Sequence, residues 1–219
     1  MKSVSAMSPS LFDLSYPLRA DMAVYPGTPP VVLKPLCTIE LDGFAENRLE
    51  ISSHTGTHID APAHMLSGGR TLDSYPLSSF EGRALVIDCS SLPASRITLS
   101  DLHPFATGIK GVDFVLLSTG WARFWGHERY FHDYPVLHED AARWLSGFTL
   151  RGIGVDAISV DASDAENFPI HHILLEAGLL LIENLVSLSS LAGRSFRFTC
   201  LPLPIESAEA APVRAVAYL

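Results

Sequence analysis

Three imidazoles and one carboxylate lie within eleven consecutive residues of this chain. The stretch comprises residues 54–64 and reads HTGTHIDAPAH. Imidazole and carboxylate together form a ligand set for zinc, manganese or iron, whereas thiolate sites use cysteine and calcium sites use only oxygen. Mostly small residues separate the candidate ligands, so little stands between them and a shared ion. The stretch therefore predicts a metal site, and with it a metal-dependent enzyme.

The spacing of the candidate ligands favours an extended chain. His54, His58 and Asp60 are all an even number of residues apart, so they share one face of a strand. A helix would align the two histidines but turn Asp60 away, and both Gly56 and Pro62 disfavour a helix. A straight strand would hold the α-carbons of His54 and His58 about 13 Å apart, which is too far for chelation. We therefore expect the chain to bend at Gly56.

A second set of candidate ligands lies far downstream. Glu183 sits inside the apolar run 179–186, where a carboxylate is costly to bury unless it is paired, protonated or bound to metal. The run is also compatible with an edge strand that turns Glu183 to water, or with a partner such as Arg151. His171 and His172 lie just upstream, and either is a plausible remote ligand. The local sequence does not decide between these two histidines.

The overall composition limits the classes of protein to consider. The 219 residues suit one domain with a substantial core, and 47% of them are hydrophobic while 18% are charged. The formal net charge of −9, without a cluster of basic and aromatic residues, excludes nucleic acid as a partner. The small polar residues 1–10 lack the apolar segment of a secretory signal, and charged residues interrupt the most apolar stretch, 173–191. We therefore expect no membrane association.

The cysteines indicate the compartment. Cys37, Cys89 and Cys200 are odd in number, widely spaced and without a CxxC pair. Such usage is typical of idle or buried thiols in a reducing environment, and it predicts a cytoplasmic protein.

The pattern of apolar runs predicts a single mixed α/β domain, rich in strands, over residues 11–219, preceded by a frayed tail over residues 1–10. Short β-branched runs bounded by turn residues indicate the strands, and acidic residues followed by an apolar face indicate a helix. The expected strands cover residues 11–18, 31–39, 47–53, 84–88, 114–118, 152–155, 158–161, 179–186 and 213–218. The expected helices cover residues 139–145 and 172–177.

Residues 54–64 resemble the HxGTHxDxPxH signature of the putative cyclase family of metal-dependent hydrolases. That family includes bacterial kynurenine formamidases (arylformamidases) and isatin hydrolases. Weaker matches follow in the same order along nearly the whole chain, at residues 13–15, 24–27, 119–120, 154–161, 171–185 and 212–215. The resemblance implies an α/β fold of the swivelling β/β/α type and assembly into a homodimer or homotetramer.

The resemblance also implies roles for individual residues. In the formamidases the first two histidines and the aspartate of the signature hold one metal, and the aspartate bridges to a second metal held by a downstream His and Glu. By position these ligands are His54, His58, Asp60, His171 and Glu183. His171 is chosen over His172 because the family pattern resembles HxxLL. The last histidine of the signature, His64, resembles the proton-transfer residue of the family. Zinc is the expected metal and manganese the alternative, with one or two ions, because isatin hydrolases resemble single-manganese enzymes.

An aromatic residue in a rigid loop is the candidate for substrate binding. Kynurenine formamidases carry a tryptophan in the loop that corresponds to residues 24–27, and this chain has Tyr25 there. Pro26 makes the loop stiff enough to hold the ring over a pocket, although Tyr25 could equally be a core residue under a surface turn. The departure from tryptophan leaves aryl formamides, cyclic amides and lactones as candidate substrates.

The ligand set predicts the reaction. A divalent ion lowers the pKa of bound water from about 15.7 to about 7 and polarises a carbonyl group, and His64 could carry a proton from that water to the leaving atom. We therefore expect a metal-dependent hydrolase that acts on the C–N bond of a small carbonyl substrate, most like an arylformamidase. The alternatives are an isatin hydrolase-type or lactone hydrolase with a single metal, and a non-catalytic protein that binds a metal or small ligand.

Overall fold

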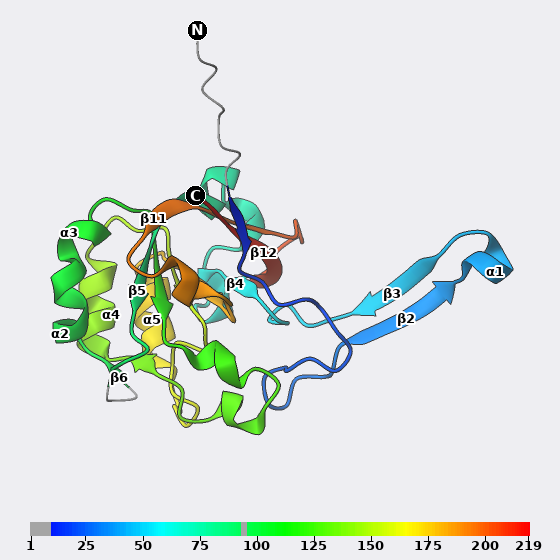
Figure 1. The fold of residues 1–219 in the computed structure, drawn as a ribbon, viewed down its shortest axis with the longest axis horizontal. Helices are drawn as coiled ribbons and strands as arrows, with labels where there is room; N and C mark the ends of the chain where they lie inside the picture. The colour runs from blue at the N-terminus through cyan, green and yellow to red at the C-terminus, as the bar shows by residue number, and fades with distance from the viewer. Residues whose placement is uncertain (1–9, 93–95) are drawn as a thin grey trace, which may run out of the picture.

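A sheet of eight strands forms the centre of the computed structural model, which describes residues 10–92 and 96–219 (Figure 1). The strands lie in the order β1-β12-β11-β5-β7-β9-β10-β4. Their bounds are β1 Leu11–Asp13, β4 His58–Asp60, β5 Glu81–Asp88, β7 Phe114–Ser118, β9 Gly152–Val155, β10 Leu180–Glu183, β11 Ser195–Pro202 and β12 Ala210–Tyr218. Because β12 also pairs with β4, seven of the strands close into a barrel-like sheet.

The middle of this sheet is parallel and is buried on both faces. Strands β5, β7, β9 and β10 run parallel to one another. Alternate side chains of β7 enter two different apolar clusters, with Phe114 and Leu116 on one face and Val115 and Leu117 on the other. Burial on both faces explains why these strands read as continuous apolar runs.

Helices cover one face of the parallel strands (Figure 1). Their bounds are α2 Leu99–Leu102, α3 Ala106–Ile109, α4 Glu139–Ser146 and α5 Pro169–Glu176. Leu102, Leu145 and Leu174 from these helices share a core cluster with Val115 and Leu117 of the sheet. Single 3-10 turns complete the chain at Pro62–His64, Leu72–Ser74, Leu77–Phe80, His103–Phe105, Trp121–Phe124, Glu128–Phe131 and Leu188–Leu191. The prediction of one mixed α/β domain rich in strands is confirmed.

A two-stranded arm projects from this body (Figure 1). Strands β2 (Val32–Cys37) and β3 (Glu46–Glu50) pair antiparallel, and the short helix α1 (Ile39–Asp42) forms the tip. A separate short parallel pair consists of β6 (Arg96–Ile97) and β8 (Val136–Leu137). No helix among the described residues is long and apolar enough to cross a membrane.

Several predicted boundaries differ from the structure. The strand predicted over residues 158–161 is wrong, because the chain bends there and brings the backbone N–H of Val160 to the Glu183 carboxylate. The strand predicted over 179–186 ends at Glu183, where Asn184 adopts a left-handed φ of 56°. The helix predicted over 172–177 begins earlier, at Pro169. The predicted tail over residues 1–10 lies, except for Ser10, outside the described residues.

Candidate metal centre

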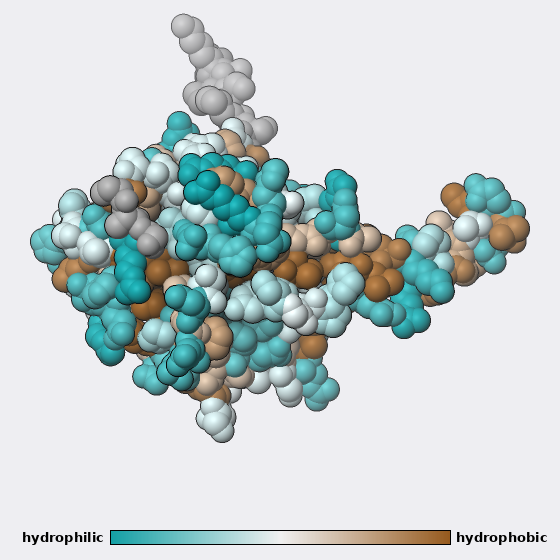
Figure 2. All heavy atoms as spheres, turned by 90° about the horizontal axis from the view of Figure 1, so that it is seen from below, coloured by the Kyte–Doolittle hydropathy of each residue, from teal (hydrophilic) through white to brown (hydrophobic). Residues whose placement is uncertain are grey.

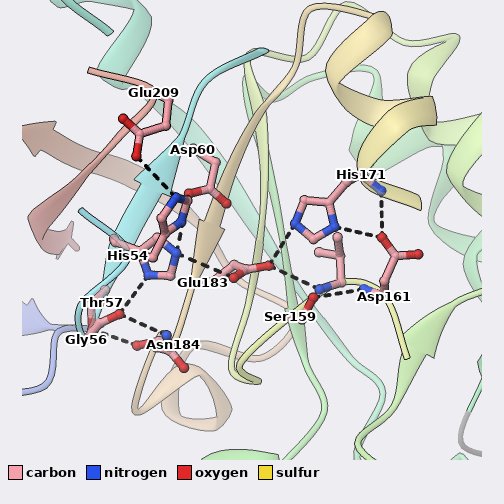
Figure 3. Close-up of polar contacts among 12 residues, drawn as sticks. His54, Gly56, Thr57, Asp60, Ser159, Asp161, His171, Glu183, Asn184 and Glu209 are labelled. Atoms are coloured by element: carbon pink, nitrogen blue, oxygen red, sulfur yellow. Dashed lines mark hydrogen bonds and ion pairs between the residues drawn. The ribbon is translucent and has the colours of Figure 1, made fainter. Parts of the chain in front are cut away.

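Residues from four separate segments converge beside β4 (Figure 3). Strand β4 carries His58 and Asp60, and it pairs antiparallel with β10 so that Glu183 lies opposite His58. The turn before β4 contributes His54, and helix α5 contributes His171 from the other side of Glu183 (Figure 3). The sheet register and one helix therefore bring together the five residues proposed as ligands.

The predicted bend at Gly56 is confirmed. Gly56 has a φ of +65°, and a Cβ atom there would lie 2.8 Å from the end of the Met22 side chain. The bend folds His54 back toward the strand, so that its Nδ1 lies 2.9 Å from Oδ1 of Asp60. Only residues 58–60 are in strand conformation, so the turn rather than shared strand parity brings His54 to the site.

Asp60 is common to two groups of potential ligand atoms. His58 and Glu183 form one group with it, and His54 and His64 form the other, with all ligand atoms of each group within 4.8 Å of one another. Nε2 of His58 lies 3.4 Å from Asp60 and 3.5 Å from Glu183.

Unsatisfied atoms at the centre of these groups fit a cation. Nε2 of His58 and both carboxylate oxygens of Asp60 are buried, yet none makes a hydrogen bond of good geometry among residues 10–92 and 96–219. The one close neighbour of Asp60 Oδ1 is Nδ1 of His54, which approaches it as an ion-pair contact. Buried polar atoms without partners are rare because each loses its hydration without compensation. A divalent ion bound between nitrogen and oxygen donors would satisfy all three atoms, so the residues present fit a metal.

The orientation of His58 is set by a chain of hydrogen bonds. Its Nδ1–H donates to the carbonyl of Gly56 at 2.8 Å, which leaves the Nε2 lone pair facing the cluster. Asn184 donates to the same carbonyl at 2.9 Å, and the hydroxyl of Tyr130 donates to the side-chain oxygen of Asn184 at 2.7 Å. Sequence reasoning missed Asn184 and Tyr130 as positioning residues.

A carboxylate holds His171 in the same way. Nδ1 of His171 lies 2.7 Å from Asp161, whose carboxylate also accepts the backbone N–H groups of Ile170 and His171. Nε2 of His171 then lies 3.5 Å from Glu183. His172 instead has a 42% exposed side chain that faces Glu176. The geometry therefore favours His171 as the metal-facing histidine.

Two charge effects act on these groups. Burial alone would lower the pKa of His171, but hydrogen bonds to Asp161 and Glu183 outweigh it and raise the pKa to about 10. Burial alone would likewise raise the pKa of Asp60, but the neighbouring imidazoles of His58 and His54 hold it well below its usual range. The cluster therefore keeps its carboxylate ionised, as a metal ligand must be.

The two alternatives for Glu183 are excluded by its surroundings. Glu183 is only 5% exposed, and β10 lies between β9 and β4 rather than at an edge. Arg151 pairs with Asp113 at 3.1 Å instead. One oxygen of Glu183 accepts the backbone N–H of Val160 at 3.1 Å, which helps to hold a carboxylate at this buried position.

His64 lies at the side of the cluster. Its ring centroid is 4.1 Å from that of His54 and 5.7 Å from that of His171. Burial lowers the pKa of His64 to about 4, and the adjacent imidazoles act in the same direction. The imidazole is therefore neutral at pH 7 and can accept a proton, although its position also lets it serve as a ligand.

A cavity of about 300 Å³ opens onto the cluster. Its walls are largely apolar and include Val24, Tyr25, Met65, Ile158 and Phe168. Tyr25 is 40% exposed and lines this cavity, so it is not a core tyrosine.

Glu209 is a further acidic residue beside the site that sequence reasoning missed. Its carboxylate lies 3.6 Å from Nε2 of His54 (Figure 3). The same carboxylate accepts a hydrogen bond from the hydroxyl of Ser53.

The fold agrees with comparisons with known proteins. The model of a family described as Putative cyclase matches residues 12–162. The chain belongs to this cyclase family. It is 34% identical to a kynurenine formamidase of Bacillus cytotoxicus over 206 residues, which cover 93% of this chain and 95% of the relative. It is 36% identical to a kynurenine formamidase of Bacillus cereus over the same shares.

Solved structures show the same fold. An isatin hydrolase bound to the product analogue thioisatinate superposes with a TM-score of 0.86 at 25% identity, over 97% of this chain and 93% of that chain. A predicted metal-dependent hydrolase from Bacillus stearothermophilus superposes with a TM-score of 0.81 at 30% identity, over 96% of this chain and 98% of that chain.

Proposed function

We propose that this protein is a metal-dependent hydrolase that cleaves the C–N bond of a small amide, with aryl formamides as its preferred substrates. The observation that carries the proposal is the set of buried atoms on His58 and Asp60 that lack a hydrogen bond of good geometry among the described residues, beside a cavity with apolar walls. The kynurenine formamidases among its relatives support an acyclic formamide. The isatin hydrolase neighbour keeps a cyclic amide as the alternative substrate.

The metal would be held by nitrogen and oxygen donors alone. The ligands we propose are His54, His58, Asp60, His171 and Glu183. Zinc is the ion we expect with this set and manganese is the alternative, with one or two ions bound per chain. When bound, the ion supplies Lewis acidity at the carbonyl oxygen and lowers the pKa of water.

The chain's own residues would complete the reaction. A ring nitrogen of His64 accepts a proton as water adds to the carbonyl carbon, and it returns that proton to the leaving nitrogen as the C–N bond breaks. The products are then a carboxylic acid, formate for a formamide, and a free amine. Asp161, Asn184 and Tyr130 would hold the ligand imidazoles in place through the hydrogen bonds described above.

Metal removal and restoration tests the proposal. Protein treated with a chelator and dialysed should lose hydrolysis of formanilide, and stoichiometric zinc or manganese should restore it. Turnover that survives complete removal, verified by elemental analysis, contradicts metal dependence.

We further propose that the protein forms a homodimer or homotetramer through the β2–β3 arm. Apolar side chains lie exposed along the arm (Figure 2). Leu41 is the most exposed of them, at 87%. They are Val32, Leu33, Leu36, Ile39, Leu41, Phe44 and Leu49. A lone two-stranded hairpin is at best marginally stable in water, so this surface needs a cover.

A second copy of the chain is the partner we favour for the arm. The body carries a second exposed apolar patch, formed by Leu77, Leu203 and Ile205 around a groove. The arm has about twenty residues, and the arm and groove together reach the 20–30 residues per side of a stable interface. Sedimentation should show an oligomer that Leu41→Glu with Phe44→Glu dissociates, whereas a monomeric parent protein contradicts the proposal.

The cytoplasm is the compartment we propose. Cys37, Cys89 and Cys200 are all free, which supports a reducing environment.

A further inference from the structure

The residue immediately before helix α5 has a backbone conformation that its side chain disfavours. Phe168 has φ 45° and ψ 53°, in the left-handed region. Residues with a bulky side chain rarely adopt this region, and a residue before a proline is biased toward extended conformations instead. Pro169 follows directly, and Asn167, whose residue type tolerates the left-handed region, lies one position earlier. Phe168 is therefore a true outlier that needs an explanation.

Hydrogen bonds fix the start of the helix that follows Phe168. The carbonyl of Phe168 accepts the backbone N–H of His172 at 3.1 Å, which closes the first turn of α5. The Asp161 carboxylate binds the next two free N–H groups, those of Ile170 and His171, at 2.8 and 2.9 Å. The start of the helix is thus fixed between Asp161 and the first helical turn, which is how local strain persists in a folded protein.

Core packing does not account for the strained backbone of Phe168. The side chain is only half-buried, and it joins none of the apolar core clusters formed by the described residues. It lines the cavity above the metal cluster instead. Its ring centroid lies 6.1 Å from that of His171, with an interplanar angle of 89°. The strained backbone thus holds an aromatic ring edge-on beside a metal-facing imidazole.

We propose that Phe168 is a specificity-determining residue that selects substrates with an aryl group on the scissile amide. This inference rests on the proposed function and names the residue that would set its preference for aryl substrates. Tyr25 supplies a second aromatic wall of the same cavity, which Ile158 and Met65 also line. Aromatic rings prefer offset or edge-to-face neighbours, so an aryl group in this cavity has suitable partners. The volume of about 300 Å³ accommodates one ring with a short acyl group.

The substitution Phe168→Asn separates selectivity from folding. Asparagine accepts the left-handed backbone but removes the ring. The test compares kcat/KM for formanilide with kcat/KM for N-butylformamide. The aryl-to-alkyl ratio should fall by about tenfold or more, within the range that hydrophobic pocket contacts supply. The melting temperature should stay level or rise, and the metal content of the purified protein should not change.

Phe148→Asn is the matched control. Phe148 is also partly buried, but it packs against the helix-side core and away from the cavity. Its substitution should lower the melting temperature and leave the aryl-to-alkyl ratio as it is. Phe168→Asn should therefore change the aryl-to-alkyl ratio but not lower the melting temperature, whereas Phe148→Asn should do the reverse.

An unchanged aryl-to-alkyl ratio in Phe168→Asn overturns the inference, even if the protein is an active hydrolase. If the parent protein hydrolyses neither amide, the proposed function fails. Calorimetric binding of formanilide to the metal-loaded protein then tests whether Phe168 contributes to a pocket for an aryl group. Binding that weakens in Phe168→Asn but not in Phe148→Asn supports the aryl pocket. Equal binding by parent and Phe168→Asn, or no binding by either, overturns it.

Discussion

The metal cluster forms the floor of the cavity, and the largely apolar residues around it form the walls. These two regions are built in different ways. On the floor, His58, Asp60 and Glu183 lie on two paired strands and are buried. On the walls, Tyr25 comes from a loop and Phe168 from a strained residue before a helix. The floor is thus specified by sheet register, whereas the walls depend on local backbone conformation. We infer that the sheet places the three buried ligands at the centre of the metal site and that substrate choice resides in the loops.

The largest effect on the floor is expected from Asp161→Asn. The carboxylate accepts the Nδ1–H of His171 and two backbone N–H groups. An asparagine amide can turn its NH2 group toward Nδ1, and it would then favour the tautomer of His171 that carries its proton on Nε2, the atom that faces the metal site. Loss of such a supporting carboxylate typically weakens metal binding about 10–100-fold. Titration of the metal-free variant with zinc measures this directly.

Asp156→Asn is the control for that change. Asp156 is equally buried and accepts the backbone N–H groups of Thr119 and Gly120, but it does not contact a proposed ligand. Its substitution should reduce stability without changing zinc affinity. Equal losses of affinity in the two variants would mean that Asp161 acts only through general stability.

The metal-free floor should also depend on pH. The pKa of His171 is raised above its ordinary value to about 10, so its protonation stabilises the metal-free fold fully below about pH 6.5. This contribution to the free energy of unfolding, on the order of a few kcal/mol, is lost as the pH rises through about 10. Chelated protein should therefore melt at a lower temperature at pH 9.5 than at pH 6.5. Bound metal replaces this proton, so an equal fall in the metal-loaded protein would contradict the account.

A smaller effect is expected from Tyr130→Phe. Its hydroxyl reaches His58 only through Asn184 and the Gly56 carbonyl, so its loss should weaken zinc binding about threefold to tenfold. Nitrogen-15 NMR shifts of the His58 ring should show a mixed tautomer in the variant. Tyr134→Phe removes a hydroxyl from another buried tyrosine that makes no bond to Asn184, and it should preserve both measurements.

The smallest effect is expected on the wall. Tyr25→Ala should raise the KM for formanilide a few-fold with little change in melting temperature, because the ring is 40% exposed. A core aromatic would instead cost about 3–5 kcal/mol on truncation to alanine. A large fall in stability with unchanged KM would contradict a role for Tyr25 in substrate binding.

Much of the floor could be predicted from the sequence because its signals are local. His54, His58 and Asp60 lie in one short motif, and Glu183 is a carboxylate within an apolar run. The parallel strands β7 and β9 match their predicted bounds, because burial on both faces makes them continuous apolar runs.

The supporting shell and the walls could not be predicted in this way. Tyr130 meets Asn184 across 54 residues of sequence, and only the folded chain brings them together. The alternating residues 158–161 favoured a strand, but the buried chain bends there. The bend lets Val160 donate its backbone N–H to Glu183 and lets Asp161 accept the first N–H groups of α5. The left-handed conformation of Phe168 has no signal in the sequence, since a phenylalanine before a proline favours the opposite. Strand β11 did have a readable alternation, SFRFTCLP, which places Phe196, Phe198 and Cys200 in the core.

The metal content of the purified protein tests the central claim most directly. The account predicts that the parent protein and His64→Asn, purified without chelators, carry the same amount of zinc or manganese per chain. Glu183→Gln should carry much less, because it replaces a buried anionic ligand with a neutral amide. A His64→Asn protein that loses its metal, or a Glu183→Gln protein that keeps it, would contradict the division between ligands and proton-transfer residue.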